Sequence, residues 1–256
     1  GIRDAAVTGV QTCALPIFIY ALTGLTEIAY TFLLLLSYLS FYRQRWLLGA
    51  AALVLSILVR PSIDLLAPLL VATFALVVHR QPGRVAAKRV AQYAFIYAAL
   101  MSTWWAHNYE KYDHFVRLSL GDGLVLYAGN NPMNRTGGGI TGVDVDLSVG
   151  AQYAPDGPGQ YALNERLNGM ALEFIRDNPA RFLELAGLKF VRFWRLWPYA
   201  QEFSSTSLVI ISVLGYGPIL LLALIALSQE TPRRWRVLTP IVMFIGYLTL
   251  VHMTTI

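Results

Sequence analysis

The apolar run WLLGAAALVLSILVRPSIDLLAPLLVATFALVVH, residues 46–79, is long enough to indicate membrane-spanning helices. One helix crossing a bilayer needs roughly 20 residues, so about 34 residues are too many for one crossing and too few for two full ones. The polar stretch RPSID at 60–64 interrupts the run, and Pro61 lacks a backbone donor and disfavours helix at Arg60. The run therefore predicts two shortish membrane helices that meet at this turn.

Further apolar segments lie on both sides of this run. The chain is 56% hydrophobic and 14% charged, with a mean hydropathy of +0.51, whereas a soluble domain is about one quarter charged. The predicted fold class is an α-helical integral membrane protein with about six spans and a small mixed α/β extracytoplasmic domain. The six predicted spans are 18–40, two helices within 46–79, then 90–107, 207–227 and 237–254.

The basic residues cluster in three short loops, at 41–45, 79–89 and 228–236. Cytoplasmic loops of membrane proteins carry an excess of Lys and Arg, and alternating spans place all three loops on that side. The same alternation places the 60–64 turn and the long segment 108–206 on the outer side. The net charge of +5 is therefore assigned to membrane topology, and no nucleic-acid partner is expected because no basic stripe with stacking aromatics occurs.

The outer segment 108–206 has a different composition, rich in Gly, Asn, Asp and Pro. Two short apolar runs around Gly121-Asp122-Gly123 predict a β-hairpin. The spacing of apolar residues from 159 to 178 predicts a helix, and Pro179 can begin a second one. That second helix carries cations on one side and aromatic residues on another, so it either lies in the membrane interface or packs on the outer domain.

The N-terminal stretch VTGVQTCALPI, residues 7–17, contains the only cysteine, Cys13, and has neither a signal-peptide pattern nor a CxxC partner. Its back-translation resembles a short-read sequencing adapter read in frame. Residues 1–17 are therefore expected to be an adapter-derived artefact in which Cys13 has no function. The expected organisation is then 18–107 with four transmembrane helices, 108–206 as the extracytoplasmic domain, and 207–256 with two more transmembrane helices.

Three ionisable residues are candidates for a functional site because they lie in or beside predicted membrane spans. Glu27 lies early in an otherwise apolar span, and Arg60 and Asp64 lie at the outer turn. Arg60 could bind a phosphate in a bidentate way, or could pair with Asp64 or a lipid headgroup. Glu27 could equally be a carboxylate that reaches the outer interface. No metal-ligand spacing and no nucleophile or phosphate-loop motif occurs, so no metal site is predicted.

Four segments in order, LTEIAYTFLLLLSYLSF, AAALVLSILVRPSIDLLAPLL, HNYEKYDHFVRLSLGDGLVLYAGNNP and ALEFIRDNPARFLELAGLKFVRFW, resemble bacterial dolichyl-phosphate-mannose protein mannosyltransferase-like enzymes. This family includes the lipid A aminoarabinose transferases and has the GT-C type fold. The resemblance implies a glycosyltransferase in the bacterial inner membrane, transferring a sugar from a polyprenyl-phosphate donor to a lipid, glycan or protein acceptor on the outer face. It implies a supporting catalytic role for Glu27 and substrate-binding roles for Arg60, Asp64, Asn130, Asn131 and His252.

The chain also departs from the family pattern. The first outer loop, with the family's acidic catalytic residue, would precede Phe18, and an arginine-rich stretch expected after His252 is absent. We therefore expect a fragment truncated at both ends and inactive alone. No cofactor is implied with certainty, and a divalent metal is left open. Two other classes are left open: a transporter or flippase component for lipid-linked sugars, and a membrane anchor with a binding ectodomain.

Overall fold

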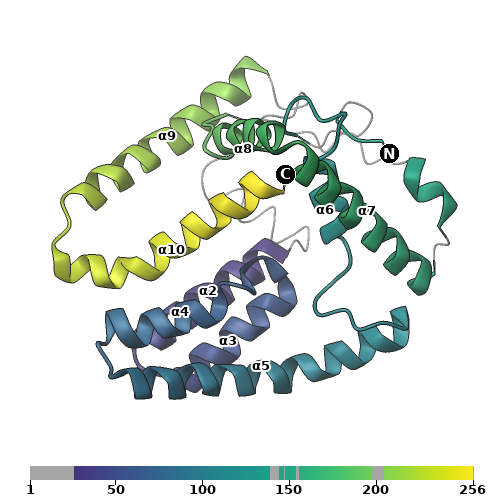
Figure 1. The fold of residues 1–256 in the computed structure, drawn as a ribbon. Coiled ribbons are helices and arrows are strands. Elements are labelled where there is room, and N and C mark those ends of the chain that lie inside the picture. Colours follow the sequence, from purple (N-terminus) through teal and green to yellow (C-terminus); the bar gives the residue numbers. More distant parts are fainter. Residues whose placement is uncertain (1–25, 139–143, 147, 154–155, 198–204, 256) are drawn as a thin grey trace, which may run out of the picture.

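The computed structural model describes residues 26–138, 144–146, 148–153, 156–197 and 205–255. The expected adapter segment 1–17, with Cys13, lies outside the described residues. Every regular element in the described ranges is a helix (Figure 1). The elements are α2 Thr26–Tyr42, α3 Trp46–Val59, 3-10 helix η1 Pro61–Ile63, α4 Ala67–Thr73, π-helix η2 Phe74–Val78, α5 Gly83–Tyr112, α6 Asp122–Gly129, 3-10 helix η3 Ser148–Gln152, α7 Gly157–Asp177, α8 Pro179–Phe193, α9 Thr206–Ser228 and α10 Pro232–Thr254.

The predicted break in the long apolar run is confirmed. Helix α3 ends at Val59, Arg60 is extended with φ −146° and ψ 120°, and Pro61 opens the 3-10 helix η1. At a rise of 1.5 Å per residue, the 14 residues of α3 span about 21 Å, well short of a hydrocarbon core of about 30 Å. The turn therefore lies between two short helices.

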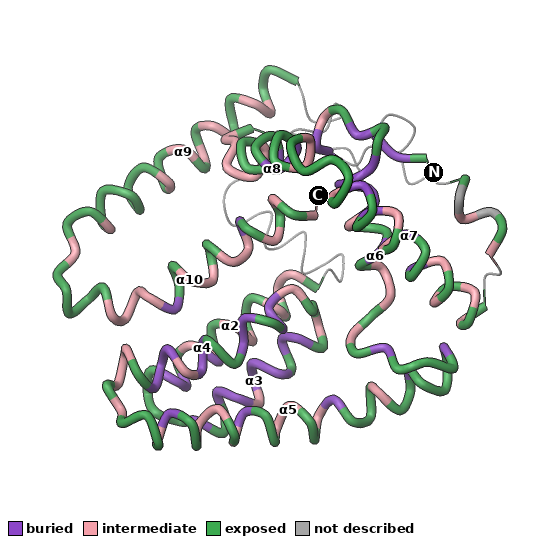
Figure 2. Tube along the Cα trace, viewed as in Figure 1, coloured by how far each residue is buried: buried purple, intermediate pink, exposed green. Residues whose placement is uncertain are grey.

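Helices α2 to α5 pack into a block with the main apolar core of the chain. Helix α2 lies along α3, and both α3 and α4 pack against α5. Figure 2 shows that burial is concentrated in this block, where Phe41, Val54 and Met101 are almost fully buried. Helices α2 and α3 approach closely at Gly49, where an added Cβ would lie 2.6 Å from Cδ1 of Phe41. A larger residue there would force the two helices apart.

Two helices, α9 and α10, are long and apolar enough to cross a membrane. No residue of α9 is buried, whereas α10 packs against α4, η2 and α8. The other apolar helices, α2, α3 and the pair α4–η2, are shorter than a full crossing in the described residues, and the predicted span 90–107 is part of the 30-residue helix α5. The structure thus supports two of the six predicted spans by length and composition.

The three basic loops lie at one end of the molecule. Nε2 of His79 lies 2.8 Å from the carbonyl oxygen of Phe41, so the loop before α5 contacts the α2–α3 turn. The Tyr38 hydroxyl donates to the carbonyl of Val237 at 2.8 Å, which places the first turns of α10 beside the same region. This end is on the left in Figure 1, and helices α6 to α8 lie away from it.

The predicted β-hairpin, and with it the mixed α/β domain, is wrong. Residues Asp122–Gly129 form helix α6, and the described residues contain no strand. Gly121 turns the chain with φ +138°, and Oδ1 of Asn164 in α7 accepts the N–H groups of Gly121 and Gly123 at 3.0 Å. A short apolar run fits strand and helix equally well, and here a cap from a distant helix selects the helix. The two predicted helices after it are confirmed as α7 and α8.

Candidate functional site

A group of charged side chains lies at the end of the helical block opposite the basic loops. We call it the charged rim and define it as Glu27, Arg60, Asp64 and Arg117. Nη1 of Arg60 lies 2.9 Å from Oε1 of Glu27, so α2 and the 60–64 turn are joined by an ion pair. Asp64 pairs with Arg117. The alternative pairing of Arg60 with Asp64 does not form, because each residue has a partner from a distant segment.

Arg117 is held in place by side chains from α5. After Tyr112 the chain turns back along this helix at Asp113, which has φ +56°. Nδ2 of Asn108 donates to the carbonyls of Val116 and Leu118 at 2.9 and 3.1 Å. The indole of Trp105 donates to the carbonyl of Arg117 itself at 2.9 Å. The backbone at Arg117 is thus fixed against α5, and its guanidinium is directed at Asp64.

Asp64 is the buried member of the rim. Its side chain is 3% exposed, and Oδ1 accepts the hydroxyl of Tyr97 at 2.7 Å. Burying a carboxylate without partners is costly, so the tyrosine and Arg117 together account for its position. A second polar contact nearby joins the hydroxyls of Tyr30 and Ser62 at 3.0 Å. These contacts hold the 60–64 turn in place and so fix the backbone of the neighbouring Arg60.

The two arginines retain free binding capacity. A guanidinium has five N–H donors, and among the described residues Arg60 and Arg117 each make one ion pair. Their side chains are 46% and 48% exposed, so the remaining donors are accessible. The rim as a whole is neutral, with two carboxylates balancing two guanidiniums. An anion could therefore bind when the free N–H groups of the arginines turn toward it. When no anion is bound, the two carboxylates balance the charge of the two arginines.

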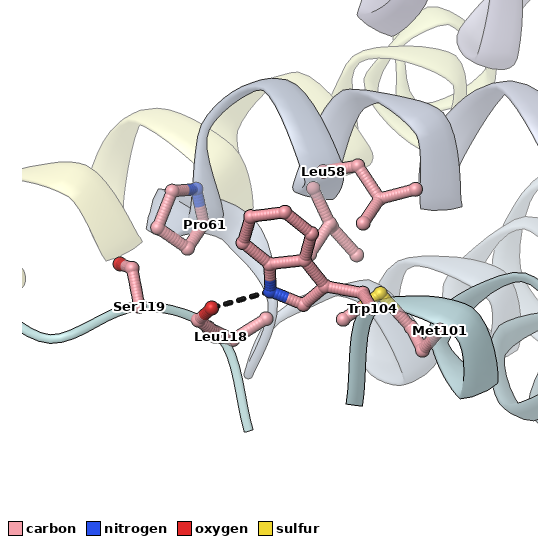
Figure 3. Close-up of a pocket in the computed structure, with 7 residues that line it drawn as sticks. Leu58, Pro61, Met101, Trp104, Leu118 and Ser119 are labelled. Carbon is pink, nitrogen blue, oxygen red and sulfur yellow. Dashed lines mark hydrogen bonds between the residues drawn. The ribbon is translucent and has the colours of Figure 1, made fainter. Parts of the chain in front are cut away.

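A small apolar pocket adjoins the rim. Its volume is about 40 Å³, enough for a few water molecules, and it lies between α3, α5 and the segment after Arg117. Figure 3 shows the indole nitrogen of Trp104 directed at the carbonyl of Leu118, with Pro61 close by. The pocket is lined by Ile57, Leu58, Pro61, Met101, Trp104, Leu118 and Ser119. It offers apolar surface beside the exposed guanidiniums rather than a cavity for a sugar ring.

The predicted substrate-binding residues Asn130 and Asn131 belong to a different network. We call it the asparagine cluster and define it as Asn130, Asn131, Asn134 and Lys189, all of them buried. Nδ2 of Asn131 donates to the carbonyls of Tyr127 and Asp144 at 2.9 and 2.8 Å, and its Oδ1 accepts the N–H of Asn134 at 3.1 Å. These bonds close the end of α6 and fix the loop behind it, so the amide of Asn131 serves the fold.

Asn130 connects α6 to two other helices. Its Nδ2 donates to the carbonyl of Thr254 at the end of α10 at 2.8 Å, and its Oδ1 accepts Nζ of Lys189 in α8 at 3.2 Å. Lys189 is 1% exposed, and this burial lowers the pKa of its amine to about 8. Removing the ammonium from water disfavours its charged form. Asn130 and Lys189 therefore hold α6, α8 and α10 together.

His252 lies beside this cluster and not in the rim. Its ring contacts the ring of Phe193 with centroids 4.7 Å apart, and its Nδ1 lies 3.0 Å from the carbonyl of Leu248. Within the described residues, no hydrogen bond or ion pair joins His252, Asn130 or Asn131 to the charged rim. The structure thus brings together Glu27, Arg60 and Asp64 and leaves the other three predicted residues elsewhere.

Sequence reasoning missed Arg117 and Lys189. Arg117 lies in an irregular segment, and only the return of the chain along α5 brings it to Asp64. Lys189 lies in an amphipathic helix where a surface position is the usual expectation. No group of three or more His, Cys, Asp or Glu side chains in the described residues could hold a metal ion.

The described residues define a helical protein with two helices long and apolar enough to cross a membrane and a charged rim at one end of its core. No family model, curated protein or solved structure matches the chain.

Proposed function

We propose that the chain is a multi-pass bacterial inner-membrane glycosyltransferase, or a part of one, whose charged rim binds the phosphate of a polyprenyl-phosphate sugar. In this proposal six spans cross the membrane, the three basic loops lie in the cytoplasm, and residues 108–206 lie outside. The sugar passes to a lipid, glycan or protein acceptor at the outer face. One observation carries the proposal: two half-exposed guanidiniums stand at the end of apolar helices, opposite the basic loops.

The rim fits the chemistry of a lipid phosphate. A polyprenyl phosphate has one anionic head on a long apolar chain, so its site must offer cations at the edge of an apolar surface. Arg60 and Arg117 supply the cations, and the pocket residues Leu58, Trp104 and Leu118 supply apolar surface next to them. Arginine suits this role because its planar fork matches phosphate oxygens bidentately.

The expected reaction is a displacement at the anomeric carbon. An acceptor hydroxyl or amine attacks this carbon, the bond from the carbon to the phosphate oxygen breaks, and a carboxylate takes the acceptor proton. Negative charge grows on the leaving phosphate, and the guanidinium of Arg60 stabilises it there. Glu27, 2.9 Å from Arg60, is positioned to orient the acceptor or the base. A single displacement inverts the configuration of the sugar.

The test is the binding of a polyprenyl phosphate to the full chain in detergent. The tryptophans of α5 next to Arg117 allow fluorescence to report binding. Arg60→Ala and Arg117→Ala are each expected to weaken binding at least tenfold, because a charge-assisted hydrogen bond is worth about 1.5–3 kcal/mol. Arg43→Ala, at the opposite end of the molecule, is the matched control and should bind like the unaltered chain. Equal binding by all four proteins would overturn the proposal.

A second measurement separates transfer from transport. The complete protein that contains this chain is placed in liposomes and supplied with a polyprenyl-phosphate sugar labelled in the sugar, and both released polyprenyl phosphate and movement of label across the bilayer are followed. Release that depends on acceptor and on Arg60 supports the transferase. Movement of intact donor without release would assign the rim to a lipid-linked sugar carrier instead.

A further inference from the structure

Helix α8, Pro179–Phe193, exposes several large apolar side chains and buries one of its charged residues, Lys189. Leu183 and Val191 are 68% and 66% exposed, and Leu188 and Phe190 are also exposed. On the opposite side, Leu185, Ala186 and Lys189 are buried. A helix on the surface of a water-soluble domain exposes mainly charged and polar side chains. The exposed side of α8 therefore needs a covering.

Contacts on the buried side fix the orientation of α8. Nζ of Lys189 donates to Asn130 at 3.2 Å, and Nη2 of Arg181 donates to the carbonyl of Asn134 at 2.8 Å. The ring of Phe193 contacts His252 of α10. Turning the helix to hide its apolar side would break these contacts and expose the loop they hold. The outward apolar side is thus imposed by the fold.

The exposed side has no polar side chain along two turns. Glu184 is the last charged residue on it, and it pairs with Arg181 at 2.5 Å. Between Glu184 and Arg192 the only charged residue is the buried Lys189. The surface between Glu184 and Arg192, formed by Leu188, Phe190 and Val191, is apolar and matches hydrocarbon.

The apolar side of α8 continues onto a helix that can cross a membrane. An added Cβ on Gly217 of α9 would lie 3.8 Å from Cδ1 of Leu196, just beyond α8. Helix α9 has no buried residue, and Figure 2 shows it coloured as exposed or intermediate along its length. Lipid that surrounds α9 therefore reaches α8 as well.

The end of α8 carries the side chains that favour a membrane–water interface. The guanidinium of Arg195 lies 4.6 Å from the ring centroid of Trp197, which is partly exposed. Tryptophan collects at the depth of lipid headgroups, and arginine extends its charge toward headgroup phosphates while its stem stays in apolar surroundings. The pair marks the polar boundary of the apolar side.

We propose that α8 lies in the interface of the bilayer, with Leu183, Leu188, Phe190 and Val191 in the acyl region and Trp197 near the headgroups. We call these four residues the α8 lipid face. The partner of this surface is a lipid membrane, not a protein segment. The contacts of Lys189 and Arg181 then connect the loop after α6 to α8, which lies at a fixed depth in the bilayer. The inference is independent of the glycosyltransferase proposal, since it requires only that the chain be in a bilayer.

The experiment measures the depth of a nitroxide on the full chain in phosphatidylcholine vesicles. Cys13 is first replaced by Ser, and Val191→Cys and Leu183→Cys are labelled separately. Arg166→Cys on the exposed side of α7 is the matched control. At positions 183 and 191 we expect collisions with dissolved oxygen to exceed those with a water-soluble nickel chelate severalfold, because oxygen concentrates in hydrocarbon. At position 166 the order should reverse.

Two outcomes overturn the proposal. Labels at 183 and 191 that meet the nickel chelate as often as the label at 166 place α8 in water. Labels shielded from both reagents place the face against protein. Both positions are exposed, and a small side chain there leaves the core contacts of α8 intact, so loss of folding does not obscure the result. The rate of collision with oxygen at positions 183 and 191 should also change when Trp197, at the headgroup end, is replaced by Ala. This change gives a second measure of depth.

Discussion

The charged rim and the asparagine cluster hold residues that the sequence assigned alike to substrate binding, yet they are built in opposite ways. In the rim, Arg60 and Arg117 each use one contact to a carboxylate and stay half exposed. In the cluster, Asn130 and Asn131 are buried, and their side-chain amides form hydrogen bonds with backbone groups. Exposed donors without a protein partner therefore indicate a polar group that can bind a ligand, whereas buried and paired amides stabilise the fold. Substitutions should therefore cost stability in the cluster and binding in the rim.

The largest expected effect is that of Asn131→Ala on stability. The change removes the buried amide that donates to the carbonyl of Asp144 and accepts the N–H groups of Met133 and Asn134, so several backbone groups lose a hydrogen bond. Each such group costs about 1–3 kcal/mol, so the free energy of unfolding should fall by about 3 kcal/mol or more. Thermal unfolding in detergent measures it.

Asn168→Ala is the matched control, since Asn168 is an asparagine of α7 whose Nδ2 makes an exposed contact to Asp122 at 3.3 Å. Its effect should be within about 0.5 kcal/mol. If Asn131→Ala unfolds like the control but loses binding of polyprenyl phosphate, Asn131 serves the ligand and the distinction between the charged rim and the asparagine cluster is wrong.

The next effect is a dependence of stability on pH from Lys189. Burial lowers its pKa to about 8, whereas the unfolded chain keeps the ordinary value of 10.5. Below pH 8 both states bind the proton and the full cost of burying the charge is present. Between pH 8 and 10.5 the unfolded state holds more protons, so stability rises with pH, by up to about 3 kcal/mol.

Lys189→Met should abolish this rise, because the side chain no longer titrates. Urea unfolding at pH 7, 9 and 10 measures the difference between variant and unaltered chain. Lys88→Met, at an exposed position of α5, is the control and should leave the rise intact. A rise that persists in Lys189→Met would assign it to other groups.

A smaller effect is expected within the rim for Asp64→Asn. The substitution keeps the shape and the contact with the Tyr97 hydroxyl but removes the charge facing Arg117. Arg117 is half exposed and partly hydrated, so the loss should be about 1–2 kcal/mol, below the 3–5 kcal/mol of a fully buried pair.

A double-mutant cycle with Arg117→Gln isolates the pairwise part of that loss. Coupling below about 0.3 kcal/mol would show that Asp64 is held by Tyr97 alone. Arg117 would then be free to serve a ligand without any cost to the fold.

The sequence predicts where the helices of this chain begin and end better than it predicts which distant segments contact each other. The apolar runs, the turn at Pro61 and the start of α8 at Pro179 follow from local rules of length and backbone geometry. The sequence predicts a strand where helix α6 lies, because the residue that caps α6, Asn164, is 41 residues away from Gly123. Local patterns contain no information about such a partner.

The same limit explains the site. Glu27, Arg60 and Asp64 were recognised as charges in apolar surroundings, but their partners come from tertiary structure. Arg60 is 33 residues from Glu27, and the carbonyls that fix Arg117 are reached only because the chain reverses at Asp113. The burial of Asn130 and Lys189 likewise depends on three helices meeting, which residue type alone does not predict.

The smallest expected effect on stability is that of Glu27→Gln. The pair with Arg60 is exposed, so its loss should change the free energy of unfolding by about 0.5 kcal/mol or less. Removing the competing negative charge should tighten binding of polyprenyl phosphate up to about fivefold at low salt, since charges at 4 Å in water interact by about 1 kcal/mol. Glu230→Gln, which breaks the exposed pair with Arg234 at the basic end, should change neither. If transfer falls while binding tightens, Glu27 acts on the acceptor or its base, and if transfer is unchanged, Glu27 only orients Arg60.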